Sequence, residues 1–217
     1  MKLEGLKINV LGDSITQGVG ASSPDKMFTE VLARKTGATV RNYGLSGSRI
    51  ANQCIERPHI IPFIPSYVER ADSMDRDADV VLVFGGTNDF GHGDAPFGEF
   101  LSEDDHTFCG AMNVLIKKLV RLFPDAEIVI MTPLHRLSEN VTTNELGLPC
   151  RVLKEYVEME KKYAEYYSLP VLDLWSTSGI QPADEVLRER FMPDTLHPSD
   201  RGHERVADRI ISLLKTL

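Results

Sequence analysis

The sequence contains little cysteine, and the few cysteines are scattered. Cys54, Cys109 and Cys150 are the only three among 217 residues, and no two of them stand at the CxxC spacing of a metal knuckle. Three separated thiols do not make the disulfide framework of a small secreted domain, and they are typical of a reducing compartment. We therefore expect a cytoplasmic protein without a metal centre.

Long hydrophobic runs and an excess of basic residues are also missing. No stretch approaches the ~20 apolar residues that a membrane-crossing helix needs, and the start of the chain, which includes Glu4 and Lys7, lacks the apolar core of a secretory signal. The chain has 24 Lys and Arg residues and 32 Asp and Glu residues, so its formal net charge is −8. An acidic surface disfavours nucleic acid and anionic lipid headgroups. We expect no nucleic-acid partner and no stable membrane insertion.

What the sequence does contain is an alternation of short apolar runs and helical patterns. Hydrophobic residues make up 42% of it, enough for one sizeable core. No linker or repeat divides the chain, so we expect a single domain over residues 1–217. The runs with the length and β-branched content of strands are residues 7–11, 39–43, 80–84, 127–131 and 170–174. Runs that are apolar at every position indicate parallel strands buried on both faces.

Helical patterns fill the segments between these runs. Ser23 followed by Pro24 is typical of a helix start, and three apolar stripes follow the helical period. The stripes are Met112, Leu115, Ile116, Leu119 and Phe123; Leu153, Tyr156, Val157, Tyr163 and Tyr167, interrupted by Glu160; and Val206, Ile210, Leu213, Leu214 and Leu217. Alternating strands and helices imply right-handed crossovers and a three-layer α/β/α sandwich with about five parallel strands.

Polar residues and glycines gather just after the predicted strands. Ser14 follows the first strand, Gly47 the second and Asn88 the third, while Asp194 and His197 precede the last helix. The carboxyl ends of parallel strands share one edge of the sheet, and ligands of such folds bind there. We therefore expect these residues around one crevice.

These residue types can carry out nucleophilic acyl transfer. A serine hydroxyl becomes nucleophilic when a neutral imidazole takes its proton. Asp194, three residues before His197, can hold one ring nitrogen and leave the other for Ser14. The oxyanion of the tetrahedral intermediate needs hydrogen-bond donors. Candidate donors are the backbone N–H groups of Ser14 and Gly47 and the side-chain amide of Asn88. The sequence thus predicts a Ser-His-Asp triad with an oxyanion hole.

The motifs around these residues resemble the four blocks of the SGNH hydrolases, also called the GDSL esterase/lipase family. Ser14 lies in GDSIT, with isoleucine where the family name has leucine; Gly47 lies in NYGLSGS, Asn88 in GTND, and Asp194 and His197 in DTLHP. The blocks occur in the family's order over nearly the whole chain. The resemblance implies a flavodoxin-like α/β/α fold with strand order 2-1-3-4-5, and ester hydrolysis without metal or cofactor.

We therefore expect a serine esterase whose partner is a small-molecule ester, with acetylated carbohydrates among the candidate substrates. The resemblance leaves a lysophospholipase, a thioesterase or an acyltransferase open, because these enzymes share the machinery and differ in the walls of the pocket. Those walls depend on the loops 49–62, 89–105 and 135–149. The second of these loops is long enough to overhang the crevice.

Three alternatives stay open on the sequence. Ser46 is a rival nucleophile, because the stretch from Gly44 to Ser48 nearly matches the GxSxG elbow. A non-catalytic, flavodoxin-like module would hold flavin or another phosphate-bearing ligand near residues 12–18, although that loop matches neither GxxxxGKS/T nor GxGxxG. A degenerate family member would bind acyl groups without turnover.

The other histidines show no metal-binding pattern. No two of them stand at a ligand spacing such as that of HExxH. We interpret His203 as a solvent-facing or packing residue of the last helix, and the rest as residues of loops or helix ends: His59, His92, His106 and His135. We assign none of them a function, and we expect Asp13 to brace the turn before Ser14.

Overall fold

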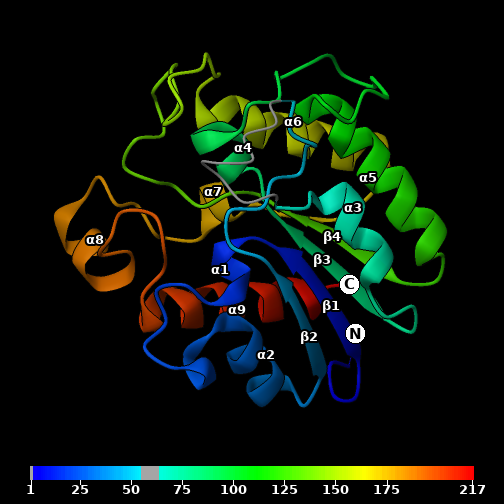
Figure 1. Ribbon diagram of the computed structural model, residues 1–217. Helices are drawn as coiled ribbons and strands as arrows, with labels where there is room; N and C mark the ends of the chain where they lie inside the picture. The colour runs from blue at the N-terminus through cyan, green and yellow to red at the C-terminus, as the bar shows by residue number, and fades with distance from the viewer. Residues whose placement is uncertain (1, 55–63) are drawn as a thin grey trace.

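The computed structural model describes residues 2–54 and 64–217, and a five-stranded sheet forms its centre (Figure 1). The strands are β1 (Lys7–Gly12), β2 (Thr39–Gly44), β3 (Val80–Phe84), β4 (Glu127–Met131) and β5 (Val171–Leu172). Every neighbouring pair is parallel, and the order is β2-β1-β3-β4-β5. This order confirms the topology implied by the family resemblance.

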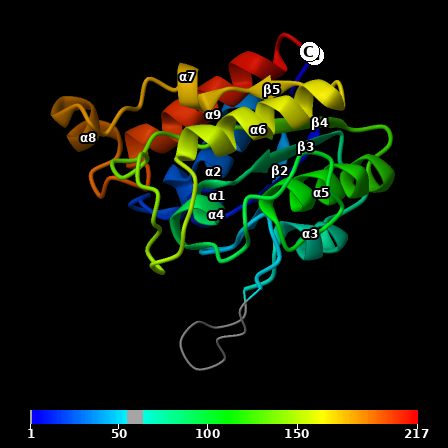
Figure 2. The same cartoon turned by 90° about the horizontal axis from the view of Figure 1, so that it is seen from above.

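Helices cover both faces of the sheet. They are α1 (Ser14–Gln17), α2 (Phe28–Thr36), α3 (Tyr67–Arg70), α4 (Thr87–His92), α5 (Phe108–Leu122), α6 (Leu153–Tyr166), α7 (Leu174–Thr177), α8 (Glu185–Phe191) and α9 (Asp200–Leu214), with short 3₁₀ helices η1 (Pro24–Lys26) and η2 (Ala71–Ser73). The helices α2 and α9 lie on one side of the sheet, and α3, α5 and α6 on the other (Figures 1 and 2). Among the described residues, no helix has the length and apolarity needed to cross a bilayer.

The alternation of side chains along β3 explains why the molecule has two cores. Val80, Leu82 and Phe84 are buried on the side of α2 and α9, whereas Val81 and Val83 are buried on the side of α3, α5 and α6. Successive side chains of a strand point to opposite faces, so a strand that is apolar at every position serves both cores. Each buried aliphatic side chain of this kind contributes about 1.5–3 kcal/mol relative to an exposed one.

The predicted helical stripes form most of the helical side of both cores. The stripe of α5 is wholly buried, and the side chain of Thr107 caps this helix by accepting a hydrogen bond from the backbone N–H of Gly110. On α6, Glu160 is buried within the apolar stripe that it interrupts. On α9, Leu217 does not belong to the stripe, because the helix ends at Leu214 and Leu217 is 44% exposed.

One predicted boundary is wrong, and another holds for a shorter helix. The strand predicted over 170–174 is limited to β5, because the side chain of Asp173 accepts a hydrogen bond from the backbone N–H of Ser176 and starts α7. Ser23 is the N-cap residue and Pro24 the first residue of a helix, as predicted, but that helix is the 3₁₀ helix η1, and the Ser23 hydroxyl donates to Asp25 instead of capping it. The α-helix that follows, α2, begins only at Phe28.

The segment predicted as an overhanging loop, 89–105, is partly helical and packs inward. It begins inside α4, and the ring of Phe97 lies 5.0 Å from that of Tyr156, while the ring of Phe100 lies 4.8 Å from that of Tyr163. These phenylalanines pack against α6 instead of lining a crevice. Residues 55–62 of the predicted loop 49–62, with His59, lie outside the described residues.

Candidate active site

Ser14 is the first residue of α1, immediately beyond the end of β1. Asp13 caps this short helix, since its Oδ1 accepts a hydrogen bond from the backbone N–H of Ile15 at 2.9 Å. Burial raises the pKa of Asp13 to about 7. The hydrogen bond from the Ile15 N–H acts to lower this pKa, and the nearby Asp89 acts to raise it. Asp13 therefore braces the turn, as predicted, and Ser14 is buried, with 6% of the residue exposed.

The loop before α9 carries an imidazole to Ser14. The Ser14 Oγ lies 3.0 Å from His197 Nε2, and the other ring nitrogen, Nδ1, lies 2.7 Å from Asp194 Oδ2. Asp194 Oδ1 accepts the backbone N–H groups of Leu196 at 2.9 Å and His197 at 2.6 Å. One carboxylate oxygen thus shapes the loop, while the other orients the imidazole.

The charge of Asp194 determines the tautomer of His197. Partial burial acts to raise the pKa of Asp194, but the N–H donors of His197 and Leu196 outweigh it and hold this pKa below its usual value. An ionised carboxylate can only accept hydrogen bonds. The proton of a neutral His197 is therefore on Nδ1, and Nε2 faces Ser14 as an acceptor.

The backbone of this loop is strained and anchored. Thr195, between the acid and the histidine, has φ 72°, a left-handed conformation that costs a non-glycine residue on the order of 1–3 kcal/mol. Its N–H donates to the Met192 carbonyl at 2.9 Å, and its carbonyl accepts the N–H of Leu137 at 3.3 Å. The segment 135–149, predicted to influence the substrate, therefore lies beside the histidine loop.

The segment that follows α1 is joined to the start of α9. His203 is buried, with Nδ1 accepting the N–H of Phe28 at 3.3 Å and Nε2 lying 3.1 Å from the carbonyl oxygen of Val19. The carboxylate of Asp200 accepts both the N–H and the hydroxyl of Ser22 at 2.7 Å. These bonds fix the two segments side by side and bring Ser14 to a residue 183 positions away in the chain.

Gly47 and Asn88 lie on loops that contact each other. Gly47 follows β2 with φ 76°, and its backbone N–H has no acceptor within residues 2–54 and 64–217. Asn88 is in the first turn of α4 and 4% exposed, and its Nδ2 donates to the carbonyl of Ser48 at 3.0 Å. The structure thus joins the glycine and asparagine segments through the residue next to Gly47.

Asp89 strengthens this junction. Its carboxylate accepts the backbone N–H groups of Ile50 and Ala51, both at 3.0 Å. Burial raises the pKa of Asp89 to about 6, although both N–H donors act in the opposite direction.

Two side chains that the sequence analysis left without a role also contact this junction. Arg49 Nη2 lies 2.8 Å from His92 Nδ1, and His92 Nε2 lies 3.1 Å from Asn88 Oδ1. The sequence signal for this contact is the spacing of four between Asn88 and His92, which brings side chains together only on a helix.

The rival nucleophile, Ser46, has no comparable partner. Its backbone N–H donates to Gln17 Oε1 at 2.6 Å. In the part of the chain that the structure describes, no imidazole nitrogen lies within hydrogen-bond distance of the Ser46 hydroxyl, in contrast to Ser14. The geometry therefore favours Ser14.

A group with the geometry to hold a cation lies elsewhere on the surface. Ligand atoms of Asp104, Asp105 and His106 lie within 4.8 Å of one another. The three residues are consecutive, and His106 Nδ1 is 3.1 Å from Asp105 Oδ1. An exposed acidic turn of this kind is common without a metal ion, and we assign it no function.

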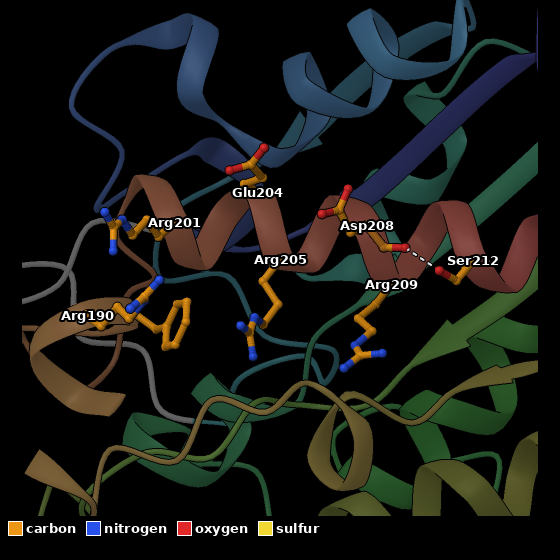
Figure 3. Close-up of a pocket in the computed structure, with 8 residues that line it drawn as sticks. Arg190, Arg201, Glu204, Arg205, Asp208, Arg209 and Ser212 are labelled. Atoms are coloured by element: carbon orange, nitrogen blue, oxygen red, sulfur yellow. Dashed lines mark hydrogen bonds between the residues drawn. The ribbon is translucent and has the colours of Figure 1, made fainter. Parts of the chain in front are cut away.

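A groove of about 430 Å³ lies between α8 and α9 (Figure 3). Arginines dominate its lining: Arg190 of α8, and Arg201, Arg205 and Arg209 of α9. The guanidinium of Arg205 lies 4.2 Å from the ring centroid of Phe191. Two carboxylates of α9, Glu204 and Asp208, also line the groove, but both pair with Lys35, at 2.9 and 2.8 Å. The groove is therefore a cationic region of an acidic protein.

The parallel sheet, with a serine after β1 and an Asp-x-x-His loop before the last helix, defines the class of α/β serine hydrolases. The profile of the GDSL-like lipase/acylhydrolase family matches residues 10–205. The chain belongs to this family, the SGNH hydrolases, and is a carboxylic ester hydrolase. The flavin-binding alternative therefore loses its support.

Solved structures share this fold. One crystal structure shares 37% sequence identity with this chain at a TM-score of 0.85, and the match covers 100% of this chain and 99% of the other. The structure of a protein from Lactobacillus plantarum shares 28% identity at a TM-score of 0.83, over 99% and 98% of the two chains. The lipase/acylhydrolase from Enterococcus faecalis, at 20% identity, a TM-score of 0.68 and coverage of 97% and 96%, shows the fold alone. No match is found among curated proteins.

Proposed function

We propose that the protein is a serine esterase that cleaves small acyl esters through an acyl-enzyme on Ser14. The observation that carries this proposal is the 3.0 Å contact between Ser14 Oγ and His197 Nε2, with Asp194 at 2.7 Å from the other ring nitrogen. His197 takes the hydroxyl proton while the oxygen attacks the ester carbonyl, and the Asp194 carboxylate stabilises the imidazolium that forms.

The remaining steps use the same groups. The backbone N–H groups of Ser14 and Gly47 and the amide of Asn88 stabilise the tetrahedral oxyanion, and each such donor typically contributes ~10²–10³ in rate. The imidazolium of His197 protonates the departing alcohol, which leaves the acyl group on Ser14. Water then gives a proton to His197 and attacks the acyl carbon, so that the acid is released and Ser14 regains its proton. These steps need neither a metal nor a cofactor.

We infer that the ester carries a short acyl group. A Cβ at Gly47 would lie 3.0 Å from Ile64 Cδ1, so an aliphatic side chain stands close to the proposed oxyanion hole. Acetylated carbohydrates are among the candidate substrates. Assays of esters that differ in acyl length and in alcohol, with thioesters and competing acyl acceptors, separate this activity from that of a lysophospholipase, a thioesterase or an acyltransferase.

We also infer a single domain over residues 1–217 and a cytoplasmic location. Both cores share the one sheet, which supports the single domain. The free thiols of Cys54, Cys109 and Cys150 support a reducing compartment.

The test of the nucleophile compares Ser14→Ala with Ser46→Ala. We expect Ser14→Ala to lower kcat for p-nitrophenyl acetate by on the order of 10³-fold or more, because the acyl-enzyme cannot form. Ser46→Ala keeps the backbone N–H that Gln17 accepts, and it should retain the wild-type rate. A fluorophosphonate should add its mass to the peptide of Ser14. Full activity in folded Ser14→Ala, or a label on Ser46, would refute the assignment.

A further inference from the structure

We propose that His92, oriented by Arg49, is a positioning residue that holds the Asn88 side chain with its NH₂ group available to the oxyanion. This inference rests on the proposed function and extends it to two residues outside the triad and the oxyanion hole.

The orientation of the Asn88 amide decides whether it can help the reaction. A carboxamide has a donor and an acceptor of nearly equal size, and only the NH₂ end can stabilise an oxyanion, since the oxygen would repel it. Asn88 Nδ2 gives one hydrogen to the Ser48 carbonyl at 3.0 Å, while Oδ1 lies 3.1 Å from His92 Nε2. The second hydrogen of Nδ2 remains for the substrate.

Arg49 determines which nitrogen of His92 carries the proton. Its Nη2 lies 2.8 Å from His92 Nδ1, and a guanidinium can only donate, so Nδ1 is an acceptor. The proton of the neutral imidazole is then on Nε2, which donates to Asn88 Oδ1. Nη2 lies also 3.2 Å from the His92 carbonyl oxygen, which fixes the guanidinium to the end of α4. Donation therefore runs in one direction, from Arg49 through His92 and Asn88 to Ser48.

The charges around His92 keep this pattern constant near neutral pH. Burial and the Arg49 cation lower the pKa of His92 to about 4. Glu145 acts to raise this pKa and Arg136 to lower it, and these two residues pair with each other at 2.9 Å. His92 is thus neutral, and Arg49 is the donor that faces its ring.

The helix α4 presents these contacts together. Asn88 and His92 stand four residues apart on one face, while Asp89 accepts the N–H groups of Ile50 and Ala51. The segment after Gly47 is therefore tied to α4 at several successive residues. The two loops that supply the proposed oxyanion donors are held as one unit, which is the preorganisation that such a site requires.

Two substitutions of His92 separate its two hydrogen bonds. An asparagine at this position reaches only as far as Nδ1, so His92→Asn keeps an acceptor for Arg49 and leaves Asn88 Oδ1 without a donor. A glutamine reaches as far as Nε2, so His92→Gln keeps that donor. We expect kcat to fall about ten-fold in His92→Asn with KM nearly unchanged, less than the ~10²–10³ for loss of an oxyanion donor because Ser48 still holds the amide. His92→Gln should recover most of this loss.

A double-mutant cycle distinguishes positioning from a purely structural role. When Asn88→Ala is already present, no amide remains to be oriented, and His92→Asn should lower kcat no further. An equal loss with and without Asn88 would overturn the proposal. Full activity of Ser14→Ala would instead contradict the proposed function, so the two failures are distinguishable.

The tautomer can be measured without any substitution. In ¹⁵N NMR of the histidine-labelled protein, His92 should show a protonated Nε2 and an unprotonated Nδ1 at neutral pH, and Arg49→Met should abolish that preference while Arg49→Lys preserves it. A proton on His92 Nδ1 in the unaltered protein would overturn the proposal whether or not the variants fold.

Discussion

Gly20 lies in the segment after α1, against the loop that carries His197. Its φ is 93°, and a Cβ at this position would lie 2.3 Å from the carbonyl oxygen of Pro198 and 3.1 Å from the Cβ of His197. A backbone oxygen cannot move away as the tip of a flexible side chain can. The place of the imidazole relative to Ser14 therefore depends on the absence of one methyl group, which only glycine provides.

We expect Gly20→Ala to lower kcat by at least about ten-fold, because a shift of ~1 Å at a catalytic group can cost up to 10²-fold. The matched control is Gly5→Ala: Gly5 has φ 83°, and nothing lies within 4 Å of its added Cβ. Both variants carry the cost of a left-handed alanine, so both should melt at a lower temperature, but Gly5→Ala should keep the wild-type kcat. Equal kcat values in the two variants would show that the histidine loop adapts.

At the scale of elements, the strands and the places of the candidate catalytic residues could be predicted from the sequence. The strand β3 is apolar at every position, and a short run of this kind is typical of a strand that is buried on both faces of a parallel sheet. Ser14 and Asn88 come soon after β1 and β3. Because parallel strands end at the same edge of the sheet, the sequence predicts that these two residues lie in the same region. The catalytic roles of Ser14, Gly47, Asn88, Asp194 and His197 remain predictions.

The contacts of α4 and β5 could not be predicted in the same way. The helix α4 begins at a glycine without a side-chain cap and spans Thr87–His92, too short for an apolar period to appear. In the sequence analysis, residues 89–105 are described as a loop, and in a loop a spacing of four does not bring the side chains of Asn88 and His92 together. The end of β5 depends on Asp173, whose carboxylate closes the next turn, a local competition that apolar content does not reveal.

The helix α6 carries a carboxyl group in the core. Both oxygens of Glu160 lack a hydrogen-bond partner among the described residues, and its Oε1 would lie 2.3 Å from a Cβ on Gly86, in the turn before α4. Burial raises the pKa of Glu160 well above its ordinary value, and the neighbouring Asp89 and Asp13 act in the same direction. Burial therefore favours the protonated form of Glu160 in the folded protein.

This proton makes the free energy of unfolding depend on pH. Above pH ~4.3 the unfolded chain releases it while the folded chain retains it, so the stability falls with rising pH, by up to about 1.4 kcal/mol per pH unit for one proton. Asp13, whose pKa is raised to about 7, also makes the free energy of unfolding fall with rising pH, up to about pH 7. We expect Glu160→Gln, compared with wild type in urea titrations, to weaken this decline and to be the more stable protein at pH ~8.

The matched control for this substitution is Glu165→Gln, at an exposed position of the same helix. It should leave the pH dependence of the unfolding free energy unchanged. If an uncharged amide at position 160 were itself too costly, Glu160→Met would show the same flattening without a polar group. A decline of unaltered steepness in both Glu160 variants would contradict the assignment of the buried proton.

For the molecule as a whole, charge is unevenly distributed. The net charge is −8, yet Arg201, Arg205 and Arg209 stand four residues apart along α9 beside a groove. Like charges at this spacing destabilise a helix by a few tenths of a kcal/mol per pair. Across residues 2–54 and 64–217, no carboxylate forms an ion pair with these arginines, because Glu204 and Asp208 pair with Lys35.

We expect a divalent anion to relieve this repulsion. Sodium sulfate should raise the melting temperature above its value in sodium chloride of equal ionic strength, partly through its general exclusion from protein surfaces. In Arg209→Gln the gain should be smaller, whereas Arg121→Gln, a substitution of the same charge on an exposed position of α5, should leave it unchanged. Equal gains in wild type and both variants would mean that only the general effect operates.

The joining of Ser14 to His197 across 183 positions has a consequence for biosynthesis. A ribosome makes the proposed nucleophile among the first residues and the proposed base among the last, and N-terminal segments begin to fold while the rest is still being made. A nascent chain that has built β1 to β4 but not the histidine loop has a serine without a proton acceptor. If Ser14 and His197 act as proposed, we expect no turnover until translation reaches that loop and α9 docks, so incomplete products left by premature termination should be inert toward esters.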